Sequence, residues 1–420
     1  MASAAAIVAP AAAGAQREHP TGSPPLPPDA PALDVGRNWQ AGATRRGRPL
    51  GNNASNVSGE VGRELAAKRH RDRRRSYRSL RYRLRSVGYA VARPNSNVSK
   101  CGRVRVKAHG VEVRRRRDGS AYFAGVVRCG SVWECPVCSA RVTSHRAAEL
   151  RFHVGAHRAT GGGCYLLTLT TPHDQGDDLK PLRKAVSDAW RAVCSGRKWV
   201  EWRKRAGLVG YVRSAEATHG ANGWHPHLHV LLFTAAPLSE ELRASLEGYV
   251  YERWCSKIQG RGYRKPSPEH GVKLVESHQD DYIQKLGLAD EVASGAFKTG
   301  REGRRSPLAI LQAYDEHHEP RDLALWKEWC DGMRGARQLT WSKGLRERHT
   351  TERELSDAEI VAAEEKGPAE VLAVIDPIMW DEAVSKRPEL QTRLLNAAED
   401  YGARGVKWIL ASEPYPGVPF

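Results

Sequence analysis

The most constraining feature of this chain is the stretch GWHPHLHVLLF at residues 223–233. It places His225, His227 and His229 at every second position and continues into an apolar run. Because alternate residues of a β-strand share a face, the three imidazoles are expected on one side and aliphatic side chains on the other. A half-buried strand does not turn imidazoles inward without partners. The stretch therefore predicts a strand that carries a metal site, although a polar strand face without a metal has the same local pattern.

The histidines have a candidate acidic partner on the preceding strand. An Asn-Gly pair just before them is a strong hairpin signal and predicts that the two strands pair antiparallel. This pairing places Glu216 opposite His227 or His229, on the same face. Two imidazoles and one carboxylate with open coordination positions can hold Mg²⁺ or Mn²⁺ against a phosphate oxygen. His225 is the alternative third ligand.

The region around the histidines alternates short β-rich runs with helical patterns. Hairpins mixed with helices favour an α+β fold with a central antiparallel β-sheet and flanking helices. The expected strands are residues 164–171, 208–218, 225–233 and 271–277, and expected helices include 239–258 and 279–287.

A metal that polarises a phosphate needs a nucleophile nearby, and the stretch DDYIQKLG offers one. On a helix, Tyr282 and Lys285 share one face at positions i and i+3. A phenol becomes a useful nucleophile when a neighbouring cation stabilises the charge that develops on it or on the phosphate. Taken alone, this spacing also fits a packed tyrosine beside a surface lysine.

Four of the eight cysteines are grouped upstream of this region. Cys135 and Cys138 form a CxxC pair, and Cys101 and Cys129 flank short strand patterns. Four thiolates at this spacing suit a tetrahedral structural Zn²⁺, which small strands with little core would need. The alternatives are a redox CxxC or unrelated buried cysteines, but a redox motif requires neither of the two upstream cysteines. The remaining cysteines are isolated and expected in the core: Cys164, Cys194, Cys255 and Cys330.

Charge is distributed unevenly along the chain. Residues 1–150 hold 28 Lys and Arg against 10 Asp and Glu, residues 151–350 hold 31 against 24, and residues 351–420 hold 7 against 14. A front this basic favours nucleic acid as partner over a membrane, because no apolar face accompanies the arginines. The sequence has neither a run of about 18 apolar residues nor the pattern of a secretory signal. We therefore expect a cytoplasmic protein with no membrane partner and with reduced cysteines.

Two basic segments are candidate DNA contacts. The arginine-rich stretch 59–100 suits a helix or arm that lies along phosphates, or a solvated basic tail. The stretch RQLTWSKGLRERH carries one tryptophan and suits either the lining of a DNA channel or a packed strand end. The candidate DNA-binding residues are Arg73, Arg74, Arg75, Arg114, Arg115, Arg116, Trp341 and Lys343.

These patterns divide the chain into five parts. The first part lacks periodic hydrophobicity and is expected to be disordered. The last is acidic with amphipathic helical spacing, and it can dock on the basic front or on a host factor. The parts are a disordered tail (1–58), a basic arm (59–100), a four-cysteine zinc module (101–145), a catalytic domain (146–350) and an acidic helical module (351–420).

Three motifs, YLLTLTTP, HPHLHVLLF and DYIQKLG, occur in the order and approximate spacing of the motifs of the HUH endonucleases. Together with CGSVWECPVC, GRRSPLAILQAY and RQLTWSKGLRE, they make residues 100–350 resemble the rolling-circle replication initiators (Rep proteins) of actinomycete plasmids. The resemblance implies an HUH-type sheet and a nicking and joining activity on plasmid origin DNA, both double-stranded and single-stranded. A host helicase and polymerase are the further partners that it implies.

By this resemblance Tyr282 attacks the scissile phosphate, which leaves a free 3′-OH as primer and a 5′-phosphotyrosyl link. His227 and His229 are then metal ligands with Glu216 as the third, and Lys285 assists at the phosphate. The covalent link conserves the energy of the phosphodiester, in agreement with a sequence that contains no GxxxxGK[ST] nucleotide-binding loop.

The chain departs from the resemblance at one position. Related initiators carry a glutamate one helical turn before the tyrosine, where this chain has His278. The residue that ends a replication round is therefore unassigned among Glu276, His278, Asp280 and Asp281. An HUH-type transposase is the alternative with the same chemistry, whereas relaxases usually place the tyrosine before the histidines. A non-catalytic zinc-dependent DNA-binding regulator is the alternative from a different class.

Overall fold

The computed structural model describes residues 59–92, 96–106, 108–277, Tyr282 and 303–413. The chain divides into two compact units, Met1–Gly59 and Glu60–Phe420, and the second is described here by itself. The tail expected to be disordered, together with Lys285, His278, Asp280 and Asp281, lies outside the described residues.

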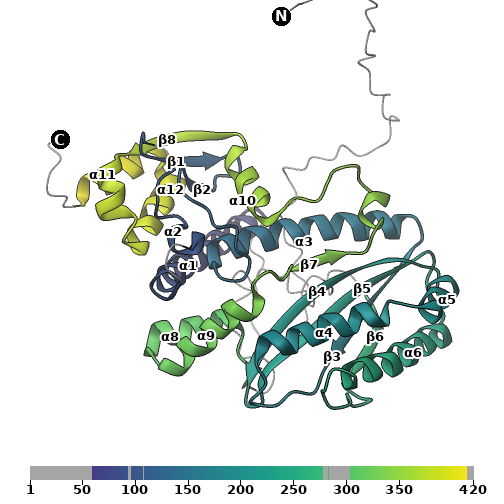
Figure 1. Cartoon of the computed structure of the whole chain (residues 1–420). Coiled ribbons are helices and arrows are strands. Elements are labelled where there is room, and N and C mark those ends of the chain that lie inside the picture. Colours follow the sequence, from purple (N-terminus) through teal and green to yellow (C-terminus); the bar gives the residue numbers. More distant parts are fainter. Residues whose placement is uncertain (1–58, 93–95, 107, 278–281, 283–302, 414–420) are drawn as a thin grey trace, which may run out of the picture. The chain divides into compact units, whose positions relative to one another are not determined.

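Helices and strands alternate through the second unit (Figure 1). The strands are β1 (Val111–Arg116), β2 (Ala121–Ala124), β3 (Gly163–Thr170), β4 (Leu208–Gly220), β5 (Gly223–Thr234), β6 (Val272–Glu276), β7 (Leu339–Trp341) and β8 (Ala369–Ile375). The helices are α1 (Gly59–Val91), α2 (Asn97–Lys100), α3 (Pro136–Ala159), α4 (Leu179–Val193), α5 (Arg197–Arg205), α6 (Glu240–Gln259), α8 (Pro307–His317), α9 (Pro320–Met333), α10 (Asp357–Lys366), α11 (Pro377–Met379) and α12 (Pro388–Ser412), with a 3₁₀ turn η2 (Arg346–Arg348) and a π turn η3 (Trp380–Val384).

The larger sheet has five antiparallel strands in the order β6-β3-β5-β4-β7. Its strands β3 to β6 agree with the four predicted strands to within a few residues, which confirms an α+β fold around an antiparallel sheet. The hairpin between β4 and β5 turns at the Asn-Gly pair, where Gly223 has a φ of 86°. That left-handed conformation is costly for residues with a Cβ, so glycine is suited to this turn.

The two faces of this sheet are covered by different elements. Leu228, Val230 and Leu232 lie in one apolar core with Trp190 of α4 and Trp254 of α6. Figure 1 shows α4 and α6 running along the sheet. The intervening residues of β5 point to the opposite face, as the two-residue period of a strand requires.

That opposite face is covered by α3. Leu231 and Phe233 of β5 lie in one apolar core with Leu150 and Val154 of this helix. The face that carries Leu231 and Phe233 is also the face of the three histidines, because all five residues alternate along one strand.

A second sheet of three strands has the order β2-β1-β8. Strand β8 comes from the C-terminal segment, for which we expected helices, so that expectation was incomplete. Arg115 of β1 pairs with Glu370 of β8, 255 residues away in the sequence. A strand whose partner is this remote leaves no local hairpin signal. One apolar core contains residues of this sheet, the four-cysteine region and α12, including Val113, Cys138 and Leu394.

The acidic C-terminal segment contacts the basic helix α1. Arg75 Nη2 lies 2.5 Å from Asp400 Oδ1, and Arg74 Nη2 lies 3.2 Å from Glu399 Oε2. Arg78 also pairs with Glu399, whose side chain is only 4% exposed. The sequence left two docking partners open for the acidic segment, the basic front and a host factor. The structure shows contacts with the basic front.

Helix α3 carries a buried histidine whose titration should be visible in the stability of the fold. His153 is 1% exposed, its ring centroid lies 4.7 Å from that of Trp341, and its Nδ1 has no hydrogen-bond partner among the described residues. Burial lowers the pKa of His153 to about 4, with Arg346 and His349 acting in the same direction and Glu149 against it. Protonation is therefore easier in the unfolded chain.

We predict that this histidine destabilises the fold as the pH falls from about 6.5 to 4, by at most about 1.4 kcal/mol per pH unit. Its contribution is complete above the unfolded pKa and is lost as pH approaches the lower folded value. His153→Phe keeps an aromatic ring but removes the titration, so its urea-unfolding free energy should fall less steeply over this window. His270→Gln, at an 80% exposed side chain, is the control. Parallel curves for wild type and His153→Phe would contradict the prediction.

Candidate active site

The β4–β5 hairpin brings the three predicted metal ligands onto one face of the sheet. Glu216 stands directly opposite His227, and Ser214 opposite His229. Glu216 Oε2 lies 3.4 Å from His229 Nε2, and the ring centroids of His227 and His229 are 5.9 Å apart. One carboxylate and two imidazoles thus share a single patch of the sheet.

A neighbouring hydroxyl contacts the ring of His229. Thr168 of β3 stands opposite His229, and its Oγ1 lies 3.2 Å from Nδ1 of that imidazole. If Nδ1 carries the hydrogen and donates it to Thr168, the lone pair of Nε2 faces the carboxylate of Glu216. Two such electron-rich atoms, 3.4 Å apart, are at the separation of two ligands bound at about 2.1 Å to one cation.

The ligand set therefore fits a divalent cation with open positions. Burial lowers the pKa of His227 well below its ordinary value, and the adjacent histidines and Arg304 lower it further, so the imidazole is neutral as a ligand must be. Of the His, Cys, Asp and Glu side chains in the described ranges, only the four cysteines bring three or more ligand atoms within 4.8 Å of one another. The ligand atoms of Glu216, His227 and His229 therefore do not all lie within that distance of one another, and a shared ion would require a side-chain rotation.

A fourth histidine, which the sequence pattern did not reveal, joins this group. His173 Nδ1 lies 3.0 Å from His225 Nδ1, and the rings of His225 and His227 are 4.0 Å apart. Thr170, at the end of β3, stands opposite His227, so the chain that leaves β3 runs toward His225. The sequence signal that could have revealed His173 is its position three residues after β3, the strand that pairs with β5.

Tyr282 lies on the histidine side of the sheet. It is 2% exposed and belongs to the apolar core that contains Leu231 and Phe233. These two residues continue the histidine face of β5. Glu276, in contrast, stands opposite Tyr165, whose side chain belongs to the core on the other face. Glu276 is therefore a poorly placed candidate for ending the reaction.

A lysine that the sequence did not single out also faces the histidine side. Strand β3 lies between β6 and β5, and its Thr168 stands opposite Lys273 of β6 on one side and His229 of β5 on the other. Directly opposite residues of antiparallel strands share a face, so this exposed lysine belongs to the row of His229. Its ammonium is suited to a DNA phosphate that approaches this face.

The four cysteines form a compact cluster at the start of α3. The sulfur of Cys101 lies 3.5 Å from that of Cys138 and 3.7 Å from that of Cys135, and Cys129 Sγ lies 3.7 Å from Cys138 Sγ. Four sulfurs at about 2.3 Å from a tetrahedral Zn²⁺ would be about 3.8 Å apart. All four sulfurs lie within 4.8 Å of one another, so the cluster can hold a zinc ion.

The candidate DNA-binding residues have different surroundings. Arg73 and Lys343 are exposed. Trp341 is half-buried against His153. The other arginines contact neighbouring side chains: Arg74 with Glu399, Arg75 with Asp400, Arg114 with Glu112, Arg115 with Glu370, and Arg116 with the ring of Tyr122. DNA binding by all eight residues stays a prediction.

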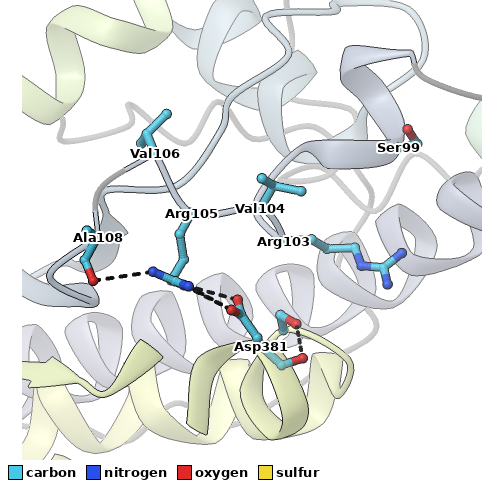
Figure 2. Close-up of a pocket in the computed structure, with 8 residues that line it drawn as sticks. Ser99, Arg103, Val104, Arg105, Val106, Ala108 and Asp381 are labelled. Carbon is cyan, nitrogen blue, oxygen red and sulfur yellow. Dashed lines mark hydrogen bonds and ion pairs between the residues drawn. The ribbon is translucent and has the colours of Figure 1, made fainter. Parts of the chain in front are cut away.

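A cavity of about 660 Å³ lies apart from the histidines, among residues 99–108 and the π turn (Figure 2). Arg105 crosses its wall and makes a forked ion pair with Asp381, with Nη2 2.8 Å from Oδ2 and Nε 3.1 Å from both carboxylate oxygens. Arg105 also donates from Nη1 to the carbonyl oxygen of Ala108 at 3.4 Å. These contacts join the four-cysteine region to the C-terminal segment, which is a structural role.

Comparison with known proteins identifies the class to which this fold and site belong. Residues 126–385 match the Replication protein family, and the chain belongs to this family. It is 27% identical to "Protein rep" of Streptomyces lividans over 307 residues, which cover 57% of this chain and 67% of that relative. The resemblance to plasmid Rep proteins is thereby confirmed. Membership indicates plasmid replication initiation and implies binding of plasmid origin DNA.

Other relatives match over shorter segments. "Protein rep" of Bacillus amyloliquefaciens is 31% identical over 105 residues, 23% of this chain and 28% of the relative. "Neomycin resistance protein" of Streptomyces cyanogenus is 29% identical over 148 residues, 29% of this chain and 34% of the relative. No solved structure matches the chain. Among the described residues, no helix is long and apolar enough to span a membrane.

Proposed function

We propose that this protein is an HUH-type nicking and joining enzyme that starts rolling-circle replication of a plasmid. It binds the double-stranded origin, engages one strand at the nick site and attacks it with Tyr282. The observation that carries the proposal is that Glu216, His227 and His229 share the sheet face against which Tyr282 packs. Membership of the replication protein family favours this function over transposition and over a purely regulatory role.

In the proposed reaction the phenolic oxygen of Tyr282 forms a bond to phosphorus as the bond from phosphorus to the 3′ oxygen breaks. The phenol loses its proton, and the leaving oxygen gains one to become the 3′-OH primer. The number of phosphoester bonds is unchanged, so the step needs no nucleotide cofactor. Mg²⁺ or Mn²⁺, when bound, would polarise the scissile phosphate.

Each side chain around the site has a distinct role in the proposed reaction. Thr168 fixes the orientation of His229, and Glu216 supplies the charged ligand. Lys285 is proposed to stabilise charge on the phosphate, and Lys273 is placed to contact an adjacent phosphate on the histidine face. The four cysteines hold Zn²⁺ in a structural role. A host helicase would then unwind the duplex, and a host polymerase would extend the 3′ end, in the cytoplasm.

The burial of Tyr282 adds a requirement. A phenol that is 2% exposed cannot reach a phosphate, so productive binding of DNA must release the ring from the apolar core that contains Leu231 and Phe233. Cleavage is therefore expected only on DNA that is already held by the protein.

The test is covalent capture of labelled single-stranded oligonucleotides that tile the plasmid origin. With Mn²⁺ or Mg²⁺, one oligonucleotide should give an adduct that survives denaturing electrophoresis, and EDTA should abolish it. His229→Gln should lower the adduct yield at least about 100-fold, because it removes a metal ligand. His270→Gln, at an exposed histidine, is the matched control. An adduct that forms equally in EDTA would refute the metal-dependent mechanism.

A further inference from the structure

The contact between His173 and His225 defines the hydrogen positions on both rings. His173 Nδ1 lies 3.0 Å from His225 Nδ1 and 3.3 Å from the carbonyl oxygen of Thr171. A carbonyl oxygen only accepts, so both contacts are hydrogen bonds only if His173 Nδ1 carries the hydrogen and donates to both. His225 Nδ1 then accepts, and the neutral ring of His225 carries its own hydrogen on Nε2.

This arrangement conflicts with metal binding by His225. A metal ligand needs a free lone pair, whereas Nδ1 of His225 is occupied by His173 and Nε2 carries a hydrogen. The ring is therefore a hydrogen-bond donor that faces the same side of the sheet as His227 and His229. Glu216 remains the third ligand.

An isolated backbone bridge holds two arginines, Arg304 and Arg305, against the β4–β5 hairpin. Arg305 forms an isolated antiparallel bridge with His219, in which His219 N donates to Arg305 O at 3.0 Å and Arg305 N to His219 O at 2.8 Å. The side chain of Arg305 is directed to Asp322, with Nη1 2.7 Å from Oδ1. The neighbouring Arg304 packs its aliphatic stem against Gly220. A Cβ added to Gly220 would lie 3.0 Å from Cγ of Arg304.

The charge of Arg304 acts on the whole histidine group. After burial and the neighbouring histidines, Arg304 lowers the pKa values of His225 and His227. Burial and then Arg304 lower the pKa of His173, whereas the hydrogen bond to the Thr171 carbonyl and the carboxylates of Asp177 and Asp174 act against them.

The stem of Arg304 packs on Gly220, which shares a face with Thr218 and Glu216, the residues opposite His225 and His227. The side chain of Arg304 therefore lies on the histidine face of the hairpin. A donor N–H and a guanidinium beside a metal site match the charge and hydrogen-bonding capacity of a phosphodiester.

We propose that His173, His225 and Arg304 form a subsite for a backbone phosphate of the DNA, next to the scissile phosphate. His225 donates its Nε2 hydrogen to this phosphate, Arg304 supplies the charge, and His173 is the positioning residue that sets the tautomer of His225. The inference rests on the proposed function, because it takes the adjacent metal site as the place of cleavage.

Two binding titrations test this assignment without any catalysis. The affinity for a short fluorescein-labelled oligothymidylate is measured by anisotropy in EDTA, and the affinity for Mn²⁺ alone is measured by electron paramagnetic resonance. His225→Leu should weaken oligonucleotide binding about 10-fold and leave Mn²⁺ affinity unchanged. His229→Gln should leave oligonucleotide binding unchanged and reduce Mn²⁺ affinity about 10- to 100-fold.

Conservative variants separate a specific role from a loss of folding. His225→Gln keeps an N–H donor near the position of Nε2, and His173→Asn keeps one near Nδ1, so both should bind the oligonucleotide like wild type. His173→Leu should behave like His225→Leu, and Arg304→Gln should lower the salt dependence of oligonucleotide binding by about one phosphate contact.

Two results would overturn the inference. Loss of Mn²⁺ affinity in His225→Leu, as large as in His229→Gln, would make His225 a metal ligand. Oligonucleotide affinity equal to wild type in both His225→Leu and Arg304→Gln would remove the phosphate subsite. Failure of the covalent capture assay would instead count against the proposed function, because the two titrations do not depend on cleavage.

Discussion

Tyr282→Phe should abolish the covalent adduct between this protein and origin DNA, with a loss of at least about 1,000-fold. The substitution removes the oxygen that would bond to phosphorus and leaves the ring that packs with Leu231 and Phe233. A ring of unchanged shape keeps its apolar contacts, so the free energy of unfolding should change by only about 1 kcal/mol. Oligonucleotide binding in EDTA should also remain, which would show that the defect lies in the chemical step.

The matched control is Tyr314→Phe, at a half-buried tyrosine of α8. It should form the adduct like wild type. Mass spectrometry of the protease-digested adduct should find the attached nucleotide on the peptide that contains Tyr282. An adduct that persists in Tyr282→Phe, with the nucleotide on another tyrosine, would show that the nucleophile is assigned wrongly.

Removal of zinc, or Cys138→Ala, should unfold the part of the protein built on the three-stranded sheet. The four sulfurs lie in the same apolar core as Val113, Leu372 and Leu394, so they join β1, β8 and α12 around one point. Zinc binding to such sites contributes apparent free energies of about 10–16 kcal/mol in small zinc domains, which equals or exceeds the whole stability of a typical domain.

Metal analysis and thermal unfolding check this prediction. Wild type should contain one zinc per chain, and Cys138→Ala should contain none and melt at a markedly lower temperature. Cys194→Ala is the control, because Cys194 lies in the separate core of the five-stranded sheet, and it should keep the zinc. Full zinc content or an unchanged melting temperature in Cys138→Ala would exclude a structural zinc site at these cysteines.

The candidate metal site could be derived largely from local sequence. The two-residue period of HPHLH determines that the histidines share a face, and the Asn-Gly turn determines which residue of the preceding strand stands opposite them. Glu216 follows from counting back from that turn, and the structure places it opposite His227. Both signals lie within about one hairpin, where the geometry of the chain leaves few alternatives.

Other features depend on contacts between distant segments. His173 meets His225 because β3 pairs with β5, and Arg304 packs on Gly220 of the histidine hairpin because residue 305 pairs with His219. The pairing of β8 with β1, and of Asp400 with Arg75, joins segments that are more than 250 residues apart in the sequence.

By itself, the sequence determined the strand that carries the histidines, the face they share, the acidic residue across the hairpin and the four cysteines that can hold a zinc ion. Each is encoded by period, turn chemistry or spacing over a short length of chain. Only the tertiary structure decided which remote segments complete the site and how the acidic and basic ends meet. Local patterns determine the direction in which a side chain points, whereas its partner across the fold depends on how the whole chain packs.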